Sequence, residues 1–336
     1  MMHVDKPGVF SLLQDCGRYG VQRLGVPVNG AMDEWSHRVA NLLVGNGKTA
    51  ATLECTLQGP HLRFDHDTLI AVTGADMEIV IDGVQAPRNR AVLVRRNATL
   101  AFGKRTGGAR AYLAVRGGFA TEPVLGSRST FVRGAFGGFE GRALRKGDQV
   151  PLHPADAGYP ELQAALISSG MPFVNGPVFR FQSHAAPMGA WRFITGPQWD
   201  AFSDKARQSF THDVFRIDAR SDRMGYRLNG PVLDLKHPLE MVSEAVNFGT
   251  IQVPPDGNPI VLMADRQGAG GYPKIGYVIS ADLPALAQAL PGDAVGFLPT
   301  TLDEAEQAYL DREDRLEILR AAIRKTLPEA LAHDPT

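Results

Sequence analysis

Residues 265–274 carry several kinds of side chain that are suited to binding and catalysis. The stretch reads DRQGAGGYPK and holds a carboxylate, a guanidinium, an amide, a phenol and an ammonium group. Its glycines let the backbone bend freely. Loops held by rigid strands are favoured places for binding, so one interpretation is a binding loop. The other is a hairpin loop whose glycines only make turns, and the residue types leave both open.

Similar polar loops, most of them with arginine and glycine, recur along the chain. They span residues 14–18, 29–33, 126–130 and 221–227. Arginine offers a planar fork of N–H donors that matches carboxylate or phosphate oxygens. Several such loops meeting in one cleft would suit an anionic small molecule. Alternatively, each arginine pairs only with an aspartate close to it in the chain.

The segments around these loops predict strands. Residues 260–264 and 275–279 are short apolar runs typical of buried strands. From residue 52 to about residue 152, short apolar runs alternate with turn residues, and Asp82-Gly83 is a hairpin signal. We therefore expect a mainly β fold with a few short helices, arranged as a barrel or a sandwich.

Two helix starts carry clear signals. Asp33 offers an N-cap to a helix that Gly45 ends. Thr301 and Glu304 fit a capping box. The helix that starts there has apolar residues on roughly one face, so we expect it to pack against the protein or to face a partner.

Composition excludes several classes of function. The chain has 336 residues, enough for two domains or one large β domain. Its net charge of −1 offers no electrostatic attraction to nucleic acid or an acidic membrane surface. No apolar run approaches the roughly 18 residues that a membrane span needs. Two cysteines make neither a disulfide framework nor a zinc set. We expect a cytoplasmic protein.

Familiar catalytic motifs are incomplete. Residues 46–49 end like a phosphate-binding P-loop, but the motif needs glycine where the chain has Leu42. Neither a G-x-S-x-G elbow nor a dinucleotide-binding glycine motif is present. Cys16 needs an activating partner to be a nucleophile, and the sequence identifies none. His61 and His66 indicate a solvated turn more than a metal site, so no metal is predicted.

Longer strings resemble the KipA family, also called the allophanate hydrolase subunit 2 family or the family of the 5-oxoprolinase C subunit. They run in order from about residue 8 to residue 298. Among them are SLLQDCGRYG, GVPVNGAMDEWSHRVANLLVGN, VLGSRST, SDRMGYRLNGP, SEAVNFGTIQVPPDGNPIVLMADRQ and GGYPKIGYVISADL. Strings this long and ordered are far more specific than a short motif.

The resemblance implies two cyclophilin-like β-barrel domains, which we expect at residues 1–155 and 175–300, before a helical tail at 301–336. It implies the C subunit of an ATP-dependent 5-oxoprolinase, which acts with the A and KipI-like B subunits. That complex uses ATP with Mg²⁺ to open 5-oxo-L-proline to L-glutamate. One alternative is the carboxyltransferase component of a urea carboxylase-like system, with biotin on a separate carrier. Another is a non-catalytic regulator that binds KipI.

The resulting hypothesis assigns roles to two sets of residues. The predicted catalytic residues are Arg266, Lys274, Asp265 and Gln252. The predicted substrate-binding residues are Arg223, Arg227, Gln267, Gly270, Gly271, Tyr272, Arg18 and Arg128. The cations would bind a small anionic substrate, the glutamines would orient it, and Asp265 would position Arg266 or act as a base.

One departure from the family falls in the opening stretch. Relatives usually read Asp-Arg-Gln-Thr-Thr-Gly-Gly-Tyr-Pro, and this chain has Gly268 and Ala269 in place of the two threonines. Two hydroxyl groups that could bind an oxyanion or a phosphate are therefore missing. We expect any difference from relatives in substrate or activity to arise here.

Overall fold

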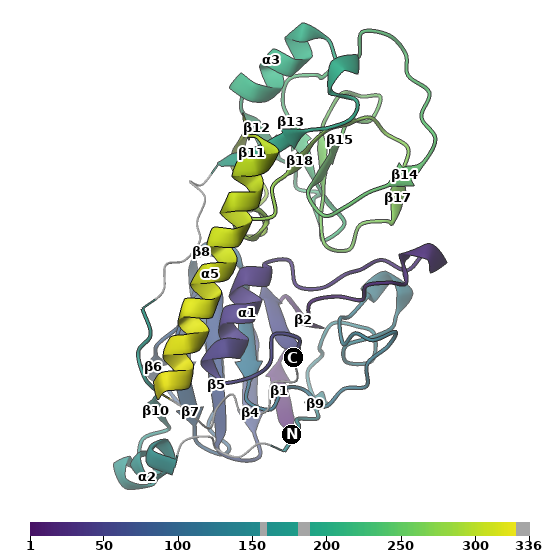
Figure 1. Cartoon of the computed structure of the whole chain (residues 1–336). Coiled ribbons are helices and arrows are strands. Elements are labelled where there is room, and N and C mark those ends of the chain that lie inside the picture. The colour runs from purple at the N-terminus through teal and green to yellow at the C-terminus, as the bar shows by residue number, and fades with distance from the viewer. Residues whose placement is uncertain (155–159, 181–188, 327–336) are drawn as a thin grey trace. The chain divides into compact units, whose positions relative to one another are not determined.

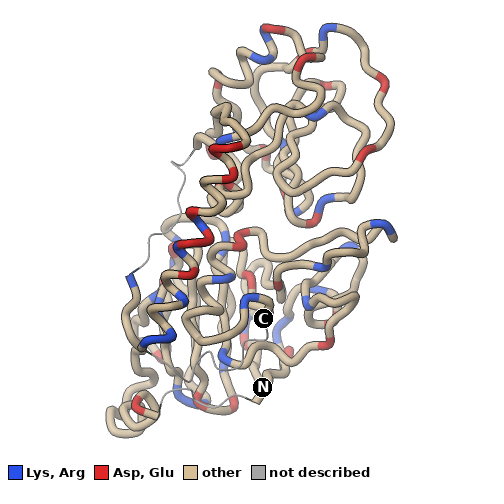
Figure 2. The backbone as a smooth tube through the Cα atoms, viewed as in Figure 1, with Lys and Arg blue, Asp and Glu red and all other residues tan. Residues whose placement is uncertain are grey.

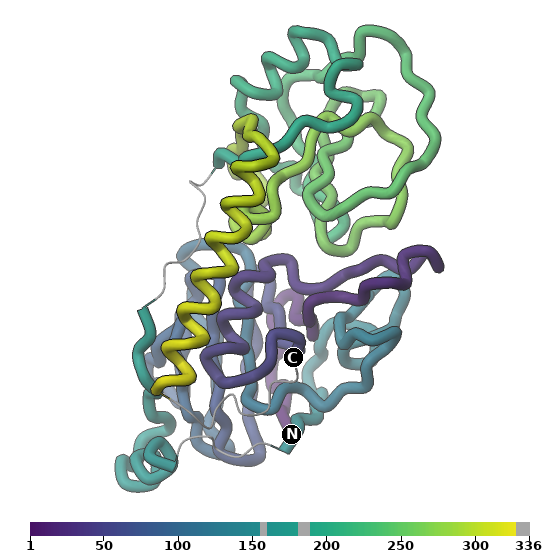
Figure 3. The backbone as a smooth tube through the Cα atoms, viewed as in Figure 1, coloured from purple at the N-terminus to yellow at the C-terminus, as the bar shows by residue number. Residues whose placement is uncertain are grey.

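The computed structural model describes residues 1–154, 160–180 and 189–326 and divides into two compact units (Figures 1 and 3). Unit 1 comprises Met1–Arg18, Asp33–Gln182 and Asp314–Thr336, and unit 2 comprises Tyr19–Met32 and Ser183–Glu313. The units are thus built from discontinuous segments. The predicted ranges 1–155, 175–300 and 301–336 stay a prediction. Parts of them, at 155, 181–188 and 327–336, lie outside the described residues.

Within the described residues, unit 1 holds a ten-stranded sheet ordered β10-β7-β5-β8-β4-β1-β9, in which β3 joins β2 to β8 and β6 pairs with β5. Its strands are β1 Met2–Lys6, β2 Phe10–Gln14, β3 Thr52–Thr56, β4 His61–Phe64, β5 Thr68–Ile81, β6 Val84–Ala86, β7 Ala91–Val94, β8 Leu100–Val115, β9 Gln149–Val150 and β10 Phe173–Asn175. Its helices are α1 Glu34–Leu43, η2 Val132–Gly134 and α2 Pro160–Ser169. The long strands β5 and β8 pair with register shifts between Gly74 and Ile79. Such bulges bend a sheet.

Two local predictions are confirmed in unit 1. Asp82 and Gly83, with φ of 46° and 81°, link β5 to β6. Positive φ at both residues is what a two-residue hairpin turn requires. Asp33 caps α1, because its carboxylate accepts a hydrogen bond of 2.9 Å from the Ser36 backbone N–H. The first strand of the chain, β1, was not predicted.

Helix α1 lies on a polar patch of the sheet. The His37 ring is hydrogen-bonded to the Thr52 hydroxyl at 2.8 Å. The Tyr112 hydroxyl donates to Glu54 at 2.8 Å and accepts from the Asp33 backbone N–H. Side chains alternate between the two faces along a strand. The residues next to Thr52 and Glu54 on β3, and next to Tyr112 on β8, therefore point into the apolar core on the other face.

Within the described residues, unit 2 is a closed barrel ordered β11-β18-β15-β16-β13-β12-β19, with a separate pair β14-β17. Its strands are β11 Ala190–Thr195, β12 Phe215–Ile217, β13 Gly225–Asn229, β14 Glu244–Ala245, β15 Thr250–Gln252, β16 Ile260–Leu262, β17 Ala269–Gly270, β18 Lys274–Val278 and β19 Ala294–Pro299. Its helices are η1 Gln22–Leu24, η3 Trp199–Ala201, α3 Asp204–His212 and α4 Leu283–Leu286. Phe210 of α3 stacks on Phe297 with ring centroids 4.4 Å apart, in a core that also holds Phe193 and Phe215.

Helix α5, Leu302–Thr326, contributes its beginning to unit 2 and its end to unit 1. The predicted capping box is confirmed: Glu304 N–H donates to the Thr301 hydroxyl at 3.2 Å, and Thr301 N–H donates to the Glu304 carboxylate at 2.9 Å. The predicted fold class is also confirmed, since one sheet closes into a barrel and the other is bent. None of the described helices combines the length and apolar character of a membrane span.

The buried His37 predicts a pH dependence of stability. Burial lowers the pKa of His37 below its ordinary value of 6.5. The folded protein therefore keeps this ring neutral where the unfolded chain binds a proton, so stability is full above that value and is lost as pH falls below it. When the pH is lowered from about 7 to about 5, we expect the urea concentration at the unfolding midpoint of the wild type to decrease. The decrease should be smaller in His37→Gln.

The exposed His212 provides the control. In His212→Gln the buried His37 is intact, so the urea midpoint should still decrease as the pH is lowered from about 7 to about 5. An equal acid-induced loss in wild type and His37→Gln would contradict the assignment to His37.

Candidate functional site

The stretch 265–274 is not a simple hairpin loop. Strands β16 and β18, which flank it, are both hydrogen-bonded to β15 and lie on opposite sides of that strand. The stretch therefore crosses the end of β15, and on the way it forms β17, which pairs with β14. The β14-β17 pair can be followed in Figure 1. Lys274 lies in β18 itself, at the rim of the barrel.

Asp265 is held in a buried ion pair. Its carboxylate accepts from Arg223 Nε at 2.9 Å and from Arg223 Nη2 at 3.0 Å, and Asn29 Nδ2 donates to it at 2.8 Å. Both charged residues are less than a tenth exposed. Arg223 also donates to the Gly30 carbonyl at 2.7 Å. The pair thus joins the arm Tyr19–Met32 to the barrel.

These contacts bear on two of the predicted roles. The Arg223 guanidinium already has a carboxylate partner, which favours a structural role over anion binding. The Asp265 carboxylate faces Arg223, and within the described residues no hydrogen bond joins it to the Arg266 guanidinium. The roles themselves stay predictions.

Arg266 has a different environment. Its Nη1 donates to the Met263 carbonyl at 3.4 Å, and its guanidinium carbon lies 5.9 Å from the centre of the Phe248 ring. Its Nε is buried and has no hydrogen-bond partner among the residues that the structure describes. Burial lowers the pKa of Arg266, while the nearby Tyr19 and Asp265 act in the opposite direction. A bound anion would supply the missing acceptor.

Arg266 lines a small pocket of about 120 Å³. The pocket is lined by Gln22, Pro27, Val28, Ala245, Val246, Asn247, Arg266, Gln267 and Gly268. A water molecule occupies about 30 Å³ of the liquid, so this space corresponds to roughly four waters. Pockets for drug-sized ligands measure about 300–1,000 Å³. The size therefore fits a small carboxylate or a similar anion.

Lys274 is a buried cation with a half-exposed partner. The Lys274 side chain is 2% exposed, and its Nζ donates to Glu244, whose side chain is 52% exposed. The Lys274 backbone N–H donates to the Gln198 side chain at 3.0 Å. Because Glu244 remains accessible to solvent, an incoming anion can compete with it for the Lys274 ammonium.

The predicted glycines and Gln252 lie beside Lys274. Gln252 pairs with Lys274 in the β15-β18 register and donates to the Tyr272 carbonyl at 3.4 Å. A Cβ atom on Gly270 would lie 2.5 Å from Gln252 Nε2, so a larger residue there would displace the Gln252 amide. Gly271 has more room, and Tyr272 is 45% exposed.

The β14-β17 pair connects the two cations. Val246 N–H donates to the Gly268 carbonyl next to the Arg266 pocket, and Glu244, the partner of Lys274, pairs with Gly270. The Val246–Gly268 contact and the Glu244–Gly270 pair are two residues apart along each strand, which corresponds to about 7 Å. The structure therefore brings Arg266, Gln267, Gly270, Gln252 and Lys274 into one region of unit 2.

The other predicted arginines lie elsewhere. Arg227 is exposed on β13. Arg18 belongs to unit 1, where it is buried, donates to the Ser129 and Val124 carbonyls and lies 4.9 Å from the Phe136 ring centre. Arg128, also in unit 1, donates to the Thr121 carbonyl at 2.8 Å. Backbone carbonyls thus bind Arg18 and Arg128, and their substrate-binding role stays a prediction.

Sequence reasoning missed Asn29, Gln198 and Glu244. Asn29 stands in a polar loop that was singled out, but nothing in its neighbours indicates contact with Asp265, 236 positions away. It also missed that His37 lies beside Cys16, with Nε2 3.8 Å from the sulfur. No group of three or more His, Cys, Asp and Glu side chains that could hold a metal occurs in the described part of the chain.

Comparisons with known proteins define the family. Residues 24–299 match the family described as carboxyltransferase domain, subdomain A and B. The match spans most of the chain, so the chain belongs to this family.

Two relatives have a more specific name. The chain is 37% identical to the C subunit of 5-oxoprolinase from Haemophilus influenzae, over 93% of this chain and 95% of that protein. It is 34% identical to the C subunit of 5-oxoprolinase from Escherichia coli, over 95% of this chain and 97% of that protein.

Other relatives are much longer. The chain is 32% identical to urea amidolyase of Lachancea kluyveri, over 98% of this chain and 18% of that protein. The crystal structure of the K. lactis urea amidolyase matches with a TM-score of 0.83 at 31% identity, over 95% of this chain. The chain spans 20% of that structure's length.

The Asp265–Arg223 pair predicts a large difference between two aspartate substitutions. Asp265→Asn removes the carboxylate charge that pairs with the buried Arg223 guanidinium, and we expect the free energy of unfolding of unit 2 to fall by about 3 kcal/mol. Asp200→Asn removes one partner of an exposed ion pair with Arg207 and should change it little. Urea unfolding measures both. Equal midpoints for Asp265→Asn and wild type would refute a stabilising role for the buried pair.

The Cys16–His37 pair predicts an unreactive thiol. Burial raises the pKa of Cys16 to about 12, and the nearby Glu34 and Asp15 also act to raise it. At pH 8 only roughly one Cys16 in ten thousand would then be a thiolate, which is the reactive form. We expect a disulfide reagent to modify the folded protein slowly and the urea-unfolded protein fast. Rapid modification of folded Cys16 at pH 8 would instead indicate an activated nucleophile.

Proposed function

We propose that this chain is the C subunit of an ATP-dependent 5-oxoprolinase, which converts 5-oxo-L-proline, ATP and water to L-glutamate, ADP and phosphate. The observation that carries the proposal is the similarity to two relatives that are named as the C subunit of 5-oxoprolinase. It extends over 95% and 97% of those proteins, but over 18% of the L. kluyveri urea amidolyase. The chain thus corresponds to nearly all of the first kind of protein and to a fraction of the second.

In this proposal the chain acts in the cytoplasm with the A and KipI-like B subunits. ATP with Mg²⁺ is a cofactor of the assembled complex. The pocket beside Arg266, at about 120 Å³, is well below the usual size of a ligand pocket and is too small for a nucleotide. The nucleotide therefore does not bind in the pocket beside Arg266.

We assign the carboxylate of 5-oxoproline to Arg266. Its buried Nε lacks a hydrogen-bond partner, so a carboxylate oxygen there would satisfy a donor that is otherwise costly to bury. Gln267 lines the same pocket and can donate to the second oxygen. The Phe248 ring, on which the guanidinium lies, keeps the cation in place.

We assign charge stabilisation at the lactam to Lys274. Activation of a lactam carbonyl by phosphorylation places negative charge on oxygen atoms, and a fixed cation in a water-poor site stabilises such charge strongly. In the absence of substrate Glu244 pairs with Lys274, and the substrate oxygen would displace it. Gln252, beside Lys274, would orient the lactam amide. Asp265 acts as a positioning residue, since its oxygens already accept from Arg223 and Asn29.

The two threonine replacements fall on this region. Gly268 lines the Arg266 pocket, and a Cβ atom there would have only the Gln22 carbonyl oxygen within 4 Å, at 3.9 Å. Ala269 is exposed on β17. A threonine side chain at position 268 would thus have room, and it would make this pocket smaller and more polar.

The assignment of Arg266 predicts a selective loss of activity. We expect Arg266→Ala to lower 5-oxoproline-dependent ATP hydrolysis by the chain, assembled with its cognate A and B subunits, about a hundredfold or more, because a buried charged donor is removed. The measurement is the rate of phosphate release with and without 5-oxoproline.

Arg216→Ala is the matched control, because Arg216 is an exposed arginine of the same unit and is not among the predicted site residues. It should retain the wild-type rate within about twofold. If Arg266→Ala also stays within about twofold, the assignment of Arg266 is wrong. If wild type shows no 5-oxoproline-dependent hydrolysis in the assembled complex, the proposed function is wrong.

The family match favours a second candidate function, the carboxyltransferase component of a biotin-dependent urea carboxylase-like system. Biotin would then be carried by a separate protein, and the same cations would bind the carboxyl group in transfer. Activity that requires a biotinylated carrier and is abolished by avidin would favour this candidate. Binding to a KipI-like protein without any ATP hydrolysis would favour a non-catalytic regulator.

A further inference from the structure

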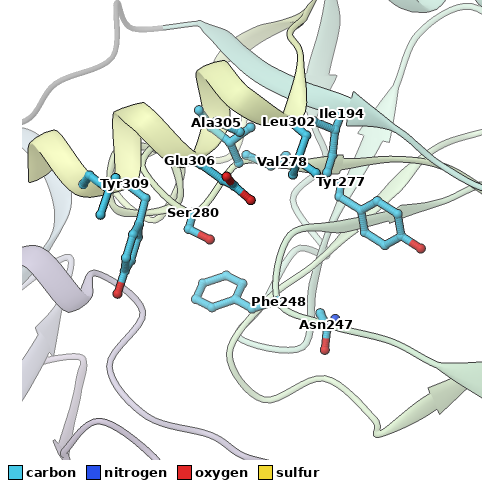
Figure 4. A pocket seen from close by; sticks show the side chains of 12 residues that line it. Ile194, Asn247, Phe248, Tyr277, Val278, Ser280, Leu302, Ala305, Glu306 and Tyr309 are labelled. Carbon is cyan, nitrogen blue, oxygen red and sulfur yellow. The ribbon is translucent and has the colours of Figure 1, made fainter. Parts of the chain in front are cut away.

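A groove in unit 2 runs between the barrel wall and the first turns of α5 (Figure 4). Its volume is about 690 Å³, within the range of about 300–1,000 Å³ that binding pockets show. The barrel contributes Phe248, Tyr277 and Val278, and the helix contributes Leu302 and Tyr309. Two of its lining residues adjoin the candidate site: the Arg266 guanidinium lies over the Phe248 ring, and Asn247 also lines the Arg266 pocket. The other lining residues belong to neither the Arg266 pocket nor the predicted site, so the groove adjoins that site but needs its own explanation.

The helix side of the groove exposes large apolar side chains. Leu302 is 59% exposed, Leu310 is 54% exposed and Tyr309 is 42% exposed. Tyr309 and Leu310 are seven and eight positions after Leu302, so the three lie on one face of the helix. Single exposed apolar residues are ordinary on a protein surface, but a group beside an apolar wall marks an interaction site.

The groove is preformed, because α5 is fastened to the barrel on both sides of it. Just before the helix, the Thr300 backbone N–H donates to the Phe193 carbonyl of β11 at 2.9 Å. Further along, Ala308 packs in a small buried cluster with Ile279, and Arg312 donates to the Ser280 carbonyl at 2.9 Å. A surface that is already ordered loses little entropy when it binds.

The groove also carries a negative charge. Glu306 is the charged residue among those that line it, and its carboxylate projects into the space beside Ser280 and Phe248 (Figure 4). No ion pair of Glu306 occurs within the described part of the chain. Asp303 and Glu304 add acidic groups in the first turn of α5. Figure 2 shows that acidic residues, in red, recur along this helix. An occupant with apolar groups and a positive charge would complement this surface.

We propose that this groove binds a segment of another protein of the complex, one that presents apolar side chains together with a lysine or arginine. The apolar groups would cover Leu302, Tyr309 and Phe248, and the cation would pair with Glu306. The inference rests on the proposed function in taking the partner from the same complex. It adds where on this chain that partner docks, and by what chemistry.

The test compares groove variants with matched controls. The affinity of the chain for its cognate A and B subunits is measured by titration calorimetry for wild type, Leu302→Asp and Glu306→Lys. Aspartate is favoured in the first turn of a helix, so Leu302→Asp should fold. We expect both variants to weaken binding at least about tenfold. The first control is Val214→Asp, because Val214 is apolar, 60% exposed and outside the groove. The second is Asp213→Lys, at the residue that precedes Val214 in the chain and is also outside the groove. They should bind within about twofold of wild type.

Salt and hydrogen exchange give independent readouts. Binding by wild type should weaken with rising salt, and Glu306→Gln should reduce that dependence. Backbone amides of residues 302–310 should exchange more slowly in the complex than in the free chain.

Each other outcome overturns the inference. Groove variants that bind like wild type, in a complex that hydrolyses ATP with 5-oxoproline, would refute the docking site and leave the proposed function standing. The inference also fails if wild type binds neither of the other subunits. It fails if Leu302→Asp prevents the chain from binding a second copy of itself but leaves binding to the other subunits unchanged. It also fails if the groove binds a small organic cation and not a protein segment. The ATP hydrolysis assay on the same mixture decides separately whether the proposed function survives.

Discussion

The buried ion pair of Asp265 and Arg223 is the constraint on which the rim of unit 2 depends. Two charges leave water there, and that desolvation is tolerated only because the guanidinium contacts both carboxylate oxygens and Asn29 donates a further hydrogen bond. The pair and its neighbours join three parts of the chain: the arm Tyr19–Met32, the turn before β13 and the segment after β16. Because Asp265 cannot move without breaking two hydrogen bonds from Arg223 and one from Asn29, the residues that follow it start from a fixed position.

Arg266 and Lys274, the two cations that follow Asp265 in the chain, have different surroundings. Arg266 has a carbonyl, an aromatic ring and a buried Nε without an acceptor, whereas Lys274 has the carboxylate of Glu244. Buried polar groups normally find partners, so an incomplete set beside a small pocket points to a ligand. The half-exposed Glu244 can give way to one. The short β14-β17 ladder keeps the two cations in one region without placing either in the barrel core.

Local signals predicted local structure well. The cap at Asp33, the turn at Asp82 and the capping box at Thr301 each depend on residues three or fewer positions apart, and all three are confirmed. The hairpin interpretation of 265–274 was wrong, because β15 lies between the flanking strands and strand order depends on contacts far apart in the chain. The contact of Cys16 with His37 could not be predicted either, because it also joins residues far apart in the chain. Burial raises the pKa of the Cys16 thiol, which disfavours the reactive thiolate.

The sequence by itself determined the mainly β class, the main turns and caps, and the long strings that resemble one family. These follow from residue type and short spacing, which the chain carries without folding. Only the tertiary structure decided which charges are already paired. Arg223 and Arg266 look alike in sequence, each in a polar loop with an aspartate next to it. Asp265 adjoins Arg266 in the chain, yet its carboxylate pairs with Arg223, 42 positions away. Electrostatic pairing depends on distance through space and on burial, and folding alone sets both.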